Sequence, residues 1–306
     1  MMDKPQLWTT LLLLCGCLAL PALFSSAAMS PAPVATATVA PGLPESDNTL
    51  TSASLSEAVQ QWMQHLAGEP GYTAWKQATW SSYPLGPGTH GWIVLIQAGG
   101  KDIGYMVIHA ADPQIPDKYQ LTEYGSGGKP LFSLHTLYQA LVQLELIHTS
   151  YTAERWYAAP MLAVWIIQAD GNSYYIDAKT GEQLPTLDLS QPKNNSLGAA
   201  SIVTSLYPEH ILKQSLELPD FNPYGKLPWL QGNPAVFASF AELEAELQLK
   251  HRITLLLELY HGQVFIALPV IGFQRWSNDG IFLKLEQDGQ RAIPYAAVAR
   301  FGKLYR

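Results

Sequence analysis

The residues that could support metal or acid–base chemistry are scattered along this sequence. Eight histidines occur, at positions 65, 90, 109, 135, 148, 210, 251 and 261. No two of them have the i, i+4 or short-loop spacing of protein metal sites, so we expect neither a metal nor another cofactor. Asp177 and Glu182 resemble a pair of catalytic carboxylates, but their place in a predicted turn accounts for both residues without a role in acid–base catalysis.

Phosphate and nucleic-acid binding are not predicted either. The glycine-rich segment 124–128, Tyr-Gly-Ser-Gly-Gly, is not followed by the Gly-Lys-Thr of a phosphate loop and fits a turn before Pro130. The formal net charge is −7, and lysine and arginine form no run that could neutralise a phosphate backbone. We therefore expect no nucleic-acid partner.

Two tryptophans are the candidates for a contact surface. Trp229 and Trp276 lie in the segments LPWLQGNP and FQRWSNDG, whose proline, glycine and asparagine make a large aromatic harder to bury. Trp62 and Trp165, in contrast, have the periodicity of core positions. We predict that Trp229 and Trp276 contact a partner, which is a peptide, a peptidase or a cell-wall polymer.

The N-terminal segment predicts export. Residues 6–24 are nearly all apolar after Lys4 and run into small residues that end at Ala28, so residues 1–28 fit a cleaved signal peptide of a bacterial secreted or envelope protein. This segment is the only predicted membrane contact, and it is long enough to stay as an anchor. Leu14-Cys15-Gly-Cys17 also resembles a bacterial lipobox, which keeps lipidation of Cys17 as an alternative.

The rest of the chain predicts an α+β protein of three folded parts. Residues 29–53 are rich in Pro, Ala, Ser and Thr and predict a disordered linker. Residues 54–130 predict a helix followed by an antiparallel meander, and residues 131–185 repeat this arrangement with a helix whose apolar positions include Leu134 and Tyr138. Residues 186–306 predict a helix-and-antiparallel-sheet domain.

The segment Trp165 to Glu182, WIIQADGNSYYIDAKTGE, predicts two paired strands that end in a defined turn. Asp170-Gly171 supplies the positive-φ residues of a tight hairpin. Asp177 can bond the amides of an Ala-Lys-Thr-Gly turn closed by Gly181.

Together with the helix before it, residues 133–185 with this ending resemble a PepSY domain, a small module of secreted peptidase propeptides. The strand pair 103–108 and 119–125 is similar to one in the prodomains of streptopain-type cysteine peptidases. Prodomains of this kind inhibit partner peptidases or assist their folding. The resemblance therefore implies a peptide or peptidase partner.

The order of elements after residue 186 resembles the papain-like cysteine peptidases of the bacteriocin-processing type. The resemblance assigns a residue of this chain to each catalytic position of that family. Gln191 is at the position of the Gln, and Ser196 is at the position of the catalytic Cys. Ile266 is at the position of the His, and Glu286 or Gln287 is at the position of the Asp. The chemistry needs a thiolate at a helix N-terminus beside an imidazolium, so this part is interpreted as a degenerate, non-catalytic peptidase-like domain. His261 is five residues from the position that the family would use.

Three functions remain open from the sequence. The leading hypothesis is a secreted non-catalytic protein that binds peptides or a partner peptidase, as a propeptide or inhibitor does. The alternatives are an active peptidase with a substituted nucleophile such as Ser196, and an envelope-anchored protein that contacts the cell wall through Trp229 and Trp276.

Overall fold

The computed structural model describes residues 53–86, 89–112, 117–185, 206–260 and 262–306. Residues 1–28, the linker up to residue 52, Gln191, Ser196 and His261 lie outside the described residues, so the expectations on them stay predictions. No helix among the described residues is long and apolar enough to cross a membrane.

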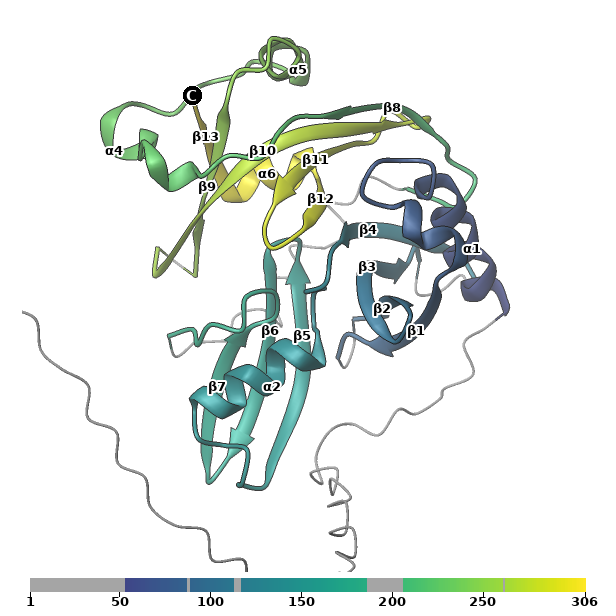
Figure 1. Ribbon diagram of the computed structural model, residues 1–306, viewed down its shortest axis with the longest axis vertical. Coiled ribbons are helices and arrows are strands. Elements are labelled where there is room, and N and C mark those ends of the chain that lie inside the picture. The colour runs from purple at the N-terminus through teal and green to yellow at the C-terminus, as the bar shows by residue number, and fades with distance from the viewer. Residues whose placement is uncertain (1–52, 87–88, 113–116, 186–205, 261) are drawn as a thin grey trace, which may run out of the picture. The chain divides into compact units, whose positions relative to one another are not determined.

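Antiparallel strands are the main regular structure of the described chain (Figure 1). A ten-stranded sheet has the order β1-β2-β3-β4-β12-β11-β10-β9-β13, and β8 pairs with β10 off this path. Its strands are β1 (Thr79–Pro84), β2 (Gly91–Ala98), β3 (Lys101–Ala110), β4 (Tyr119–Ser126), β8 (Leu212–Glu217), β9 (Ile253–Leu259), β10 (Val264–Trp276), β11 (Ile281–Glu286), β12 (Gln290–Pro294) and β13 (Gly302–Tyr305). A separate three-stranded sheet contains β5 (Tyr151–Ala159), β6 (Leu162–Ala169) and β7 (Asn172–Asp177) in that order.

The predicted fold class of two helix-plus-meander modules followed by a papain-like helix-and-sheet domain is wrong. Strand β4 pairs with β12 at Arg291↔Gly125 and Ala292↔Tyr124, so strands expected in the first and last modules belong to one sheet. A side chain at Gly125 would prevent this pairing, because its Cβ would lie 2.6 Å from the carbonyl oxygen of Gln290. The fold is dominated by sheet, and the helices cover it.

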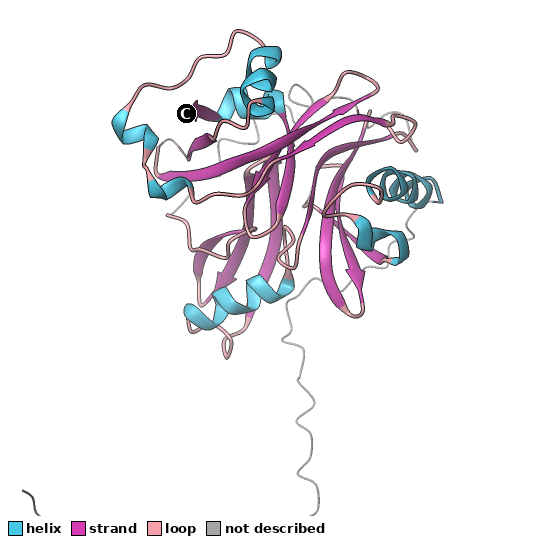
Figure 2. Cartoon of the chain, turned by 45° about the horizontal axis from the view of Figure 1, so that its top comes forward, coloured by secondary structure: helices cyan, strands magenta, loops and turns pink. Residues whose placement is uncertain are grey.

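The described helices are short, apart from the first. They are α1 (Ala53–Leu66), α2 (Leu134–Gln143), α4 (Pro228–Gln231), α5 (Phe240–Gln248) and α6 (Tyr295–Phe301), with 3-10 turns η1 (Thr73–Gln77) and η3 (Pro223–Gly225). Figure 2 shows the helices on the outside of the sheets, and Figure 1 shows α2 lying across β5–β7. Helix α1 buries the predicted apolar face, with Val59, Trp62 and Leu66 fully buried.

Three large hydrophobic clusters form most of the core of the described residues. One joins α1 to one face of β2–β4 and includes Trp62, Met106 and Trp276. A second joins α2 and β5–β7 to the other face of β2 and β3, with Trp165 and Tyr105 among its members. The third lies under α5 and α6 against β9–β12. Because the second cluster draws on both β2–β3 and β5–β7, the two sheets share a core.

Helix α2 departs from its sequence prediction on one face. Leu137 and Leu141 are buried, but Leu134 and Tyr138, two of the apolar positions that predicted this helix, are exposed. The buried stripe includes Thr136 and Ala140 instead. Helix α2 therefore has apolar residues on its covered face and on its open face.

Candidate functional site

A buried cluster of polar side chains brings together segments from distant parts of the chain. Glu123 on β4 is 0% exposed, and its carboxylate accepts hydrogen bonds from the hydroxyls of Tyr105 (2.6 Å) and Tyr157 (3.0 Å). The guanidinium of Arg291 on β12 donates to the same carboxylate from Nε at 2.6 Å. Its Nη1 donates to the side-chain oxygen of Gln287 at 2.8 Å. The four elements β3, β4, β5 and β12 thus meet at one carboxylate.

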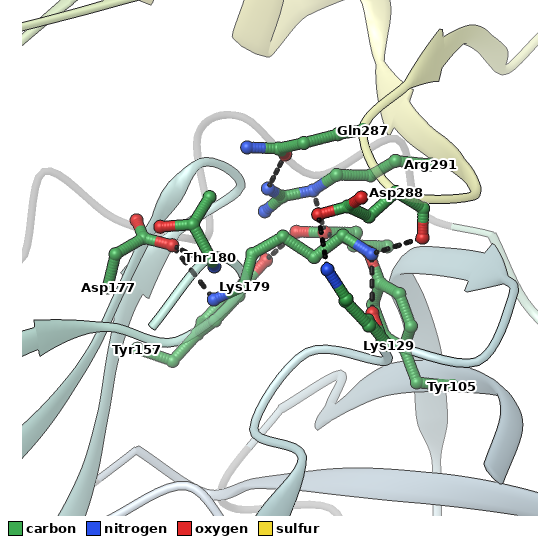
Figure 3. A network of polar contacts seen from close by, with 10 residues as sticks. Tyr105, Lys129, Tyr157, Asp177, Lys179, Thr180, Gln287, Asp288 and Arg291 are labelled. Carbon is green, nitrogen blue, oxygen red and sulfur yellow. Dashed lines mark hydrogen bonds and ion pairs between the residues drawn. The ribbon is translucent and has the colours of Figure 1, made fainter. Parts of the chain in front are cut away.

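A lysine from the predicted Asp-Ala-Lys-Thr-Gly turn completes this cluster (Figure 3). The ammonium of Lys179, which is buried, donates to the backbone carbonyls of Lys129 and Asp288, the latter at 3.3 Å. Asp288 also forms an exposed ion pair with Lys129 at 3.2 Å. We call Tyr105, Glu123, Tyr157, Lys179 and Arg291 the polar junction.

Burial and charge set the protonation of the junction. Burial and the nearby Glu123 carboxylate raise the pKa values of Tyr105 and Tyr157 well above that of a free phenol, so both hydroxyls stay donors. Burial has the largest single effect on the pKa of Arg291 and would lower it, but the Glu123 carboxylate, Tyr105 and Asp177 together raise the pKa above its ordinary value. Burial, and then the charge of Arg291, lower the pKa of Lys179 to about 8.

These contacts join distant segments of the fold, and their charged groups are buried. Glu123, Lys179 and Arg291 are each at most 3% exposed, and the Glu123 oxygens are occupied by three donors. A buried ion pair of this kind is costly to break, because removal of one partner leaves an uncompensated charge. We therefore assign the polar junction to positioning: it fixes the β7 turn and the β11–β12 hairpin against β3 and β4.

The turn that presents Lys179 has the geometry predicted from its sequence. The Asp177 carboxylate accepts the amides of Lys179 (2.9 Å) and Thr180 (2.7 Å). Gly181 has φ +78° and donates its amide to the carbonyl of Asp177. In the hairpin before it, Asp170 and Gly171 both have positive φ, as predicted.

Replacing Asp177 by alanine is expected to destabilise the protein by about 1–3 kcal/mol, since two amides in a mostly buried turn lose a charged acceptor. Chemical denaturation of Asp177→Ala and of the wild type measures this difference. Asp177→Asn is the matched control, because its side-chain oxygen still accepts from both amides, and we expect it to lose less. Equal losses in the two variants would contradict the role given to the carboxylate oxygen.

The sequence-predicted peptidase positions are not brought together in the described residues. Ile266 on β10 pairs with Leu257 of β9 and packs against the third core cluster. Glu286 ends β11, and its carboxylate accepts the amide of Gly289 at 2.7 Å, which closes the β11–β12 turn. The pairing of β10 with β11 starts at Val270↔Leu285, so Ile266 lies beyond the paired stretch.

Trp276 is not a surface residue, and its prediction as a contact residue is wrong. It is fully buried, and its indole nitrogen donates to the Tyr124 hydroxyl at 3.2 Å. The reason is that β10 runs through residue 276 and the Ser-Asn-Asp-Gly turn follows it, so the indole points from a strand end into the first core cluster.

Trp229 is half-buried, and several apolar side chains near it in the chain are exposed. Its ring packs edge-on against Tyr224 with centroids 5.6 Å apart, and the Tyr224 hydroxyl accepts the amide of Ala267 on β10 at 3.2 Å. Phe265, two residues before Ala267 on the same strand, is exposed. We call Tyr224, Leu227, Trp229, Leu230 and Phe265 the aromatic surface.

Metal binding finds no support in the described parts of the chain, where no group of three or more His, Cys, Asp or Glu side chains could hold an ion. Comparison with known proteins adds no assignment: no family model matches the chain, and no curated protein matches it.

Sequence reasoning placed Lys179 in its turn but singled out no residue of the polar junction as a site, and it missed the charged pair Glu123 and Arg291 altogether. Their signal was weak, because each is a single charge in a strand that otherwise reads as apolar or mixed. A carboxylate inside a strand that is buried along its whole length requires a partner, but the partner is 168 residues away in the chain.

Proposed function

We propose that this protein is a secreted, non-catalytic binding protein that takes up an apolar peptide segment, either of a free peptide or of a partner peptidase, at the aromatic surface. The PepSY-like ending of residues 133–185 supports a peptidase-related partner.

The observation that carries the proposal is the exposure of large apolar side chains on η3, on α4 and on β10, the strand that Tyr224 contacts. Leu230 is 72% exposed, Phe265 58% and Tyr224 53%. Exposed apolar side chains that gather in one patch mark interaction sites in soluble proteins, and tyrosine and tryptophan are enriched among the residues that dominate binding. The hydroxyl of Tyr224 in η3 accepts the amide of Ala267 and so holds this segment against β10, which positions the aromatic rings before a partner arrives.

Panning a random peptide library on the purified protein tests the proposal. We expect enrichment of peptides with apolar and aromatic residues. Their affinity, measured by fluorescence anisotropy, should fall at least about tenfold in Trp229→Ala and in Phe265→Ser, which corresponds to about 1.4 kcal/mol or more for each variant.

A matched control is available on helix α2. Tyr138 is 58% exposed, as Phe265 is, but it lies outside the aromatic surface. Tyr138→Ser should bind the selected peptides like the wild type. No enriched peptide, or peptides whose affinity is unchanged in both aromatic-surface variants, would contradict the proposal.

A peptidase partner is tested separately. The purified protein, added to secreted peptidases of the same organism, should form a complex with one of them or inhibit it. The Trp229→Ala variant should lose this effect.

A further inference from the structure

Arg155 on β5 is a buried cation for which the described residues supply no counter-ion. It is 6% exposed, and its side chain lies on the same face of β5 as Ala153 and Tyr157 of the second core cluster. No carboxylate within the described ranges forms an ion pair with it. A buried charge is normally paired, because taking it out of water without a partner is costly. Arg155 therefore lacks the acceptor that its burial requires.

Two aromatic rings contact the guanidinium of Arg155. Its Cζ lies 4.7 Å from the ring centroid of Tyr83 on β1 and 4.8 Å from that of Trp165 on β6. Cation–π contacts of this kind offset part of the cost of burial. They supply no acceptor for the N–H bonds, which lie in the plane of the guanidinium. The rings thus hold the group in place and leave its donors unused.

The donors of this stack differ in their access to solvent. Nε of Arg155 and the indole N–H of Trp165 are both fully buried and have no acceptor among the described residues. Nη1 and Nη2 of Arg155 make no hydrogen bond with the described residues either, but they are not fully buried. The end of the guanidinium that carries Nη1 and Nη2 is therefore the side that an anion from solvent can reach.

We propose that Arg155 binds a carboxylate group, with Nη1 and Nη2 donating two parallel hydrogen bonds to its two oxygens. The planar guanidinium matches a carboxylate in geometry, and paired hydrogen bonds between these two groups are among the strongest that side chains make. The bound carboxylate gives the buried cation the acceptor that the described chain does not provide.

The charge of the site favours an anion with one negative charge. Burial lowers the pKa of Arg155 to about 10, and Tyr83 raises it, so the guanidinium is charged at neutral pH. No second cation among the described residues contributes to this pKa. A carboxylate neutralises one guanidinium, whereas phosphate groups are bound by clusters of arginines.

Two sources can supply this carboxylate: the C-terminus of a peptide, or an aspartate or glutamate side chain. The three residues of the site belong to β1, β5 and β6, whereas those of the aromatic surface belong to residues 224–230 and β10. The proposal therefore does not rest on peptide binding at the aromatic surface, and the two sites can be tested separately.

Acetate is the simplest probe of the site. The chain contains six arginines, so their Nε–H signals can be resolved by NMR, and the Arg155 signal is the one that is absent in Arg155→Lys. Chloride is replaced by acetate up to about 0.3 M at constant ionic strength, which keeps salt screening the same. We expect the Arg155 signal to shift and saturate with millimolar or weaker affinity, while that of the exposed Arg300 stays unchanged.

Acetate should also stabilise the protein, because a ligand that binds only the folded state shifts the unfolding equilibrium. We expect about 0.3 M acetate in place of chloride to raise the midpoint of thermal unfolding by about 2–4 °C. Most of this rise should disappear in Arg155→Met, and Arg300→Met is the matched control that should keep it. Without acetate, Arg155→Met should unfold at no lower a temperature than the wild type, because methionine removes an unpaired buried charge.

Three capped tripeptides distinguish the sources of the carboxylate. Acetyl-Ala-Ala-Ala with a free C-terminus presents a terminal carboxylate, and acetyl-Ala-Asp-Ala amide presents a side-chain carboxylate. At least one of them should move the Arg155 signal. Acetyl-Ala-Ala-Ala amide, which has neither group, should not.

Three results would overturn the proposal. The first is an Arg155 signal that moves no more in acetate than in chloride, and the second is an acetate effect on stability that is equal in Arg155→Met and the wild type. The third is an Arg155→Met variant that is less stable than the wild type without acetate, because the guanidinium would then be a structural contact that needs no anion.

Discussion

Replacing Glu123 by leucine is expected to lower the free energy of unfolding by about 3–5 kcal/mol, the largest effect of any single substitution considered for this protein. The variant leaves the Arg291 guanidinium in the core without its carboxylate, and it leaves the hydroxyls of Tyr105 and Tyr157 without an acceptor. Urea denaturation followed by tryptophan fluorescence measures the loss, since Trp165 and Trp276 report on cores on either side of the sheet.

The double variant Glu123→Leu with Arg291→Met separates the charge from the packing. Removing both partners avoids the unpaired cation, so we expect the double variant to recover a large part of the loss, although the two phenols still lack an acceptor. A single variant within about 1 kcal/mol of the wild type, or a double variant no more stable than Glu123→Leu, would show that the polar junction does not hold these elements together.

Lowering the pH from 6.5 to 4 is expected to destabilise the protein by about 3 kcal/mol through His109 alone. His109 on β3 is 6% exposed, and its Nδ1 is hydrogen-bonded to the Thr122 hydroxyl at 2.8 Å. Burial lowers its pKa from 6.5 to about 4 in the folded protein. Between these two values the unfolded chain binds a proton that the folded protein does not, so stability is full above pH 6.5 and falls as the pH decreases towards 4.

The variant His109→Gln isolates this contribution, because glutamine can still bond Thr122 but does not titrate. The free energy of unfolding of wild type and variant is measured at several pH values from 7 to 4. The difference between them should change by about 3 kcal/mol over this range, with the wild type losing more. Parallel profiles would mean that His109 takes up its proton in the folded state at an ordinary pH.

The local structure of this chain could be predicted because its signals are local. The Asp170-Gly171 hairpin and the Asp177 turn depend on neighbouring residues only, and both have the expected geometry. The strands were recognisable from alternation in the same way. The pairing between distant strands could not be predicted. The pairing of β4 with β12 requires Gly125 to fit against Gln290, and no local pattern in either segment points to the other.

The polar junction was hidden by an irregularity in β4. Strict alternation puts Leu121 and Glu123 on the same face of that strand. In the structure the pairing shifts, with Ile108 opposite Leu121 and Val107 opposite Glu123, so Thr122 is an extra residue. A bulge of this kind turns the following side chains to the other face. Leu121 therefore lies in the first core cluster, whereas Glu123 reaches Tyr105 and Tyr157.

Binding at the aromatic surface is the central claim, and hydrogen exchange measured by mass spectrometry with and without a selected peptide tests it most directly. The peptide should slow exchange of the backbone amides in residues 223–231 and around Phe265, and leave helix α2 unchanged. Slower exchange confined to other parts of the chain, or no change at a peptide concentration that saturates binding, would contradict the claim.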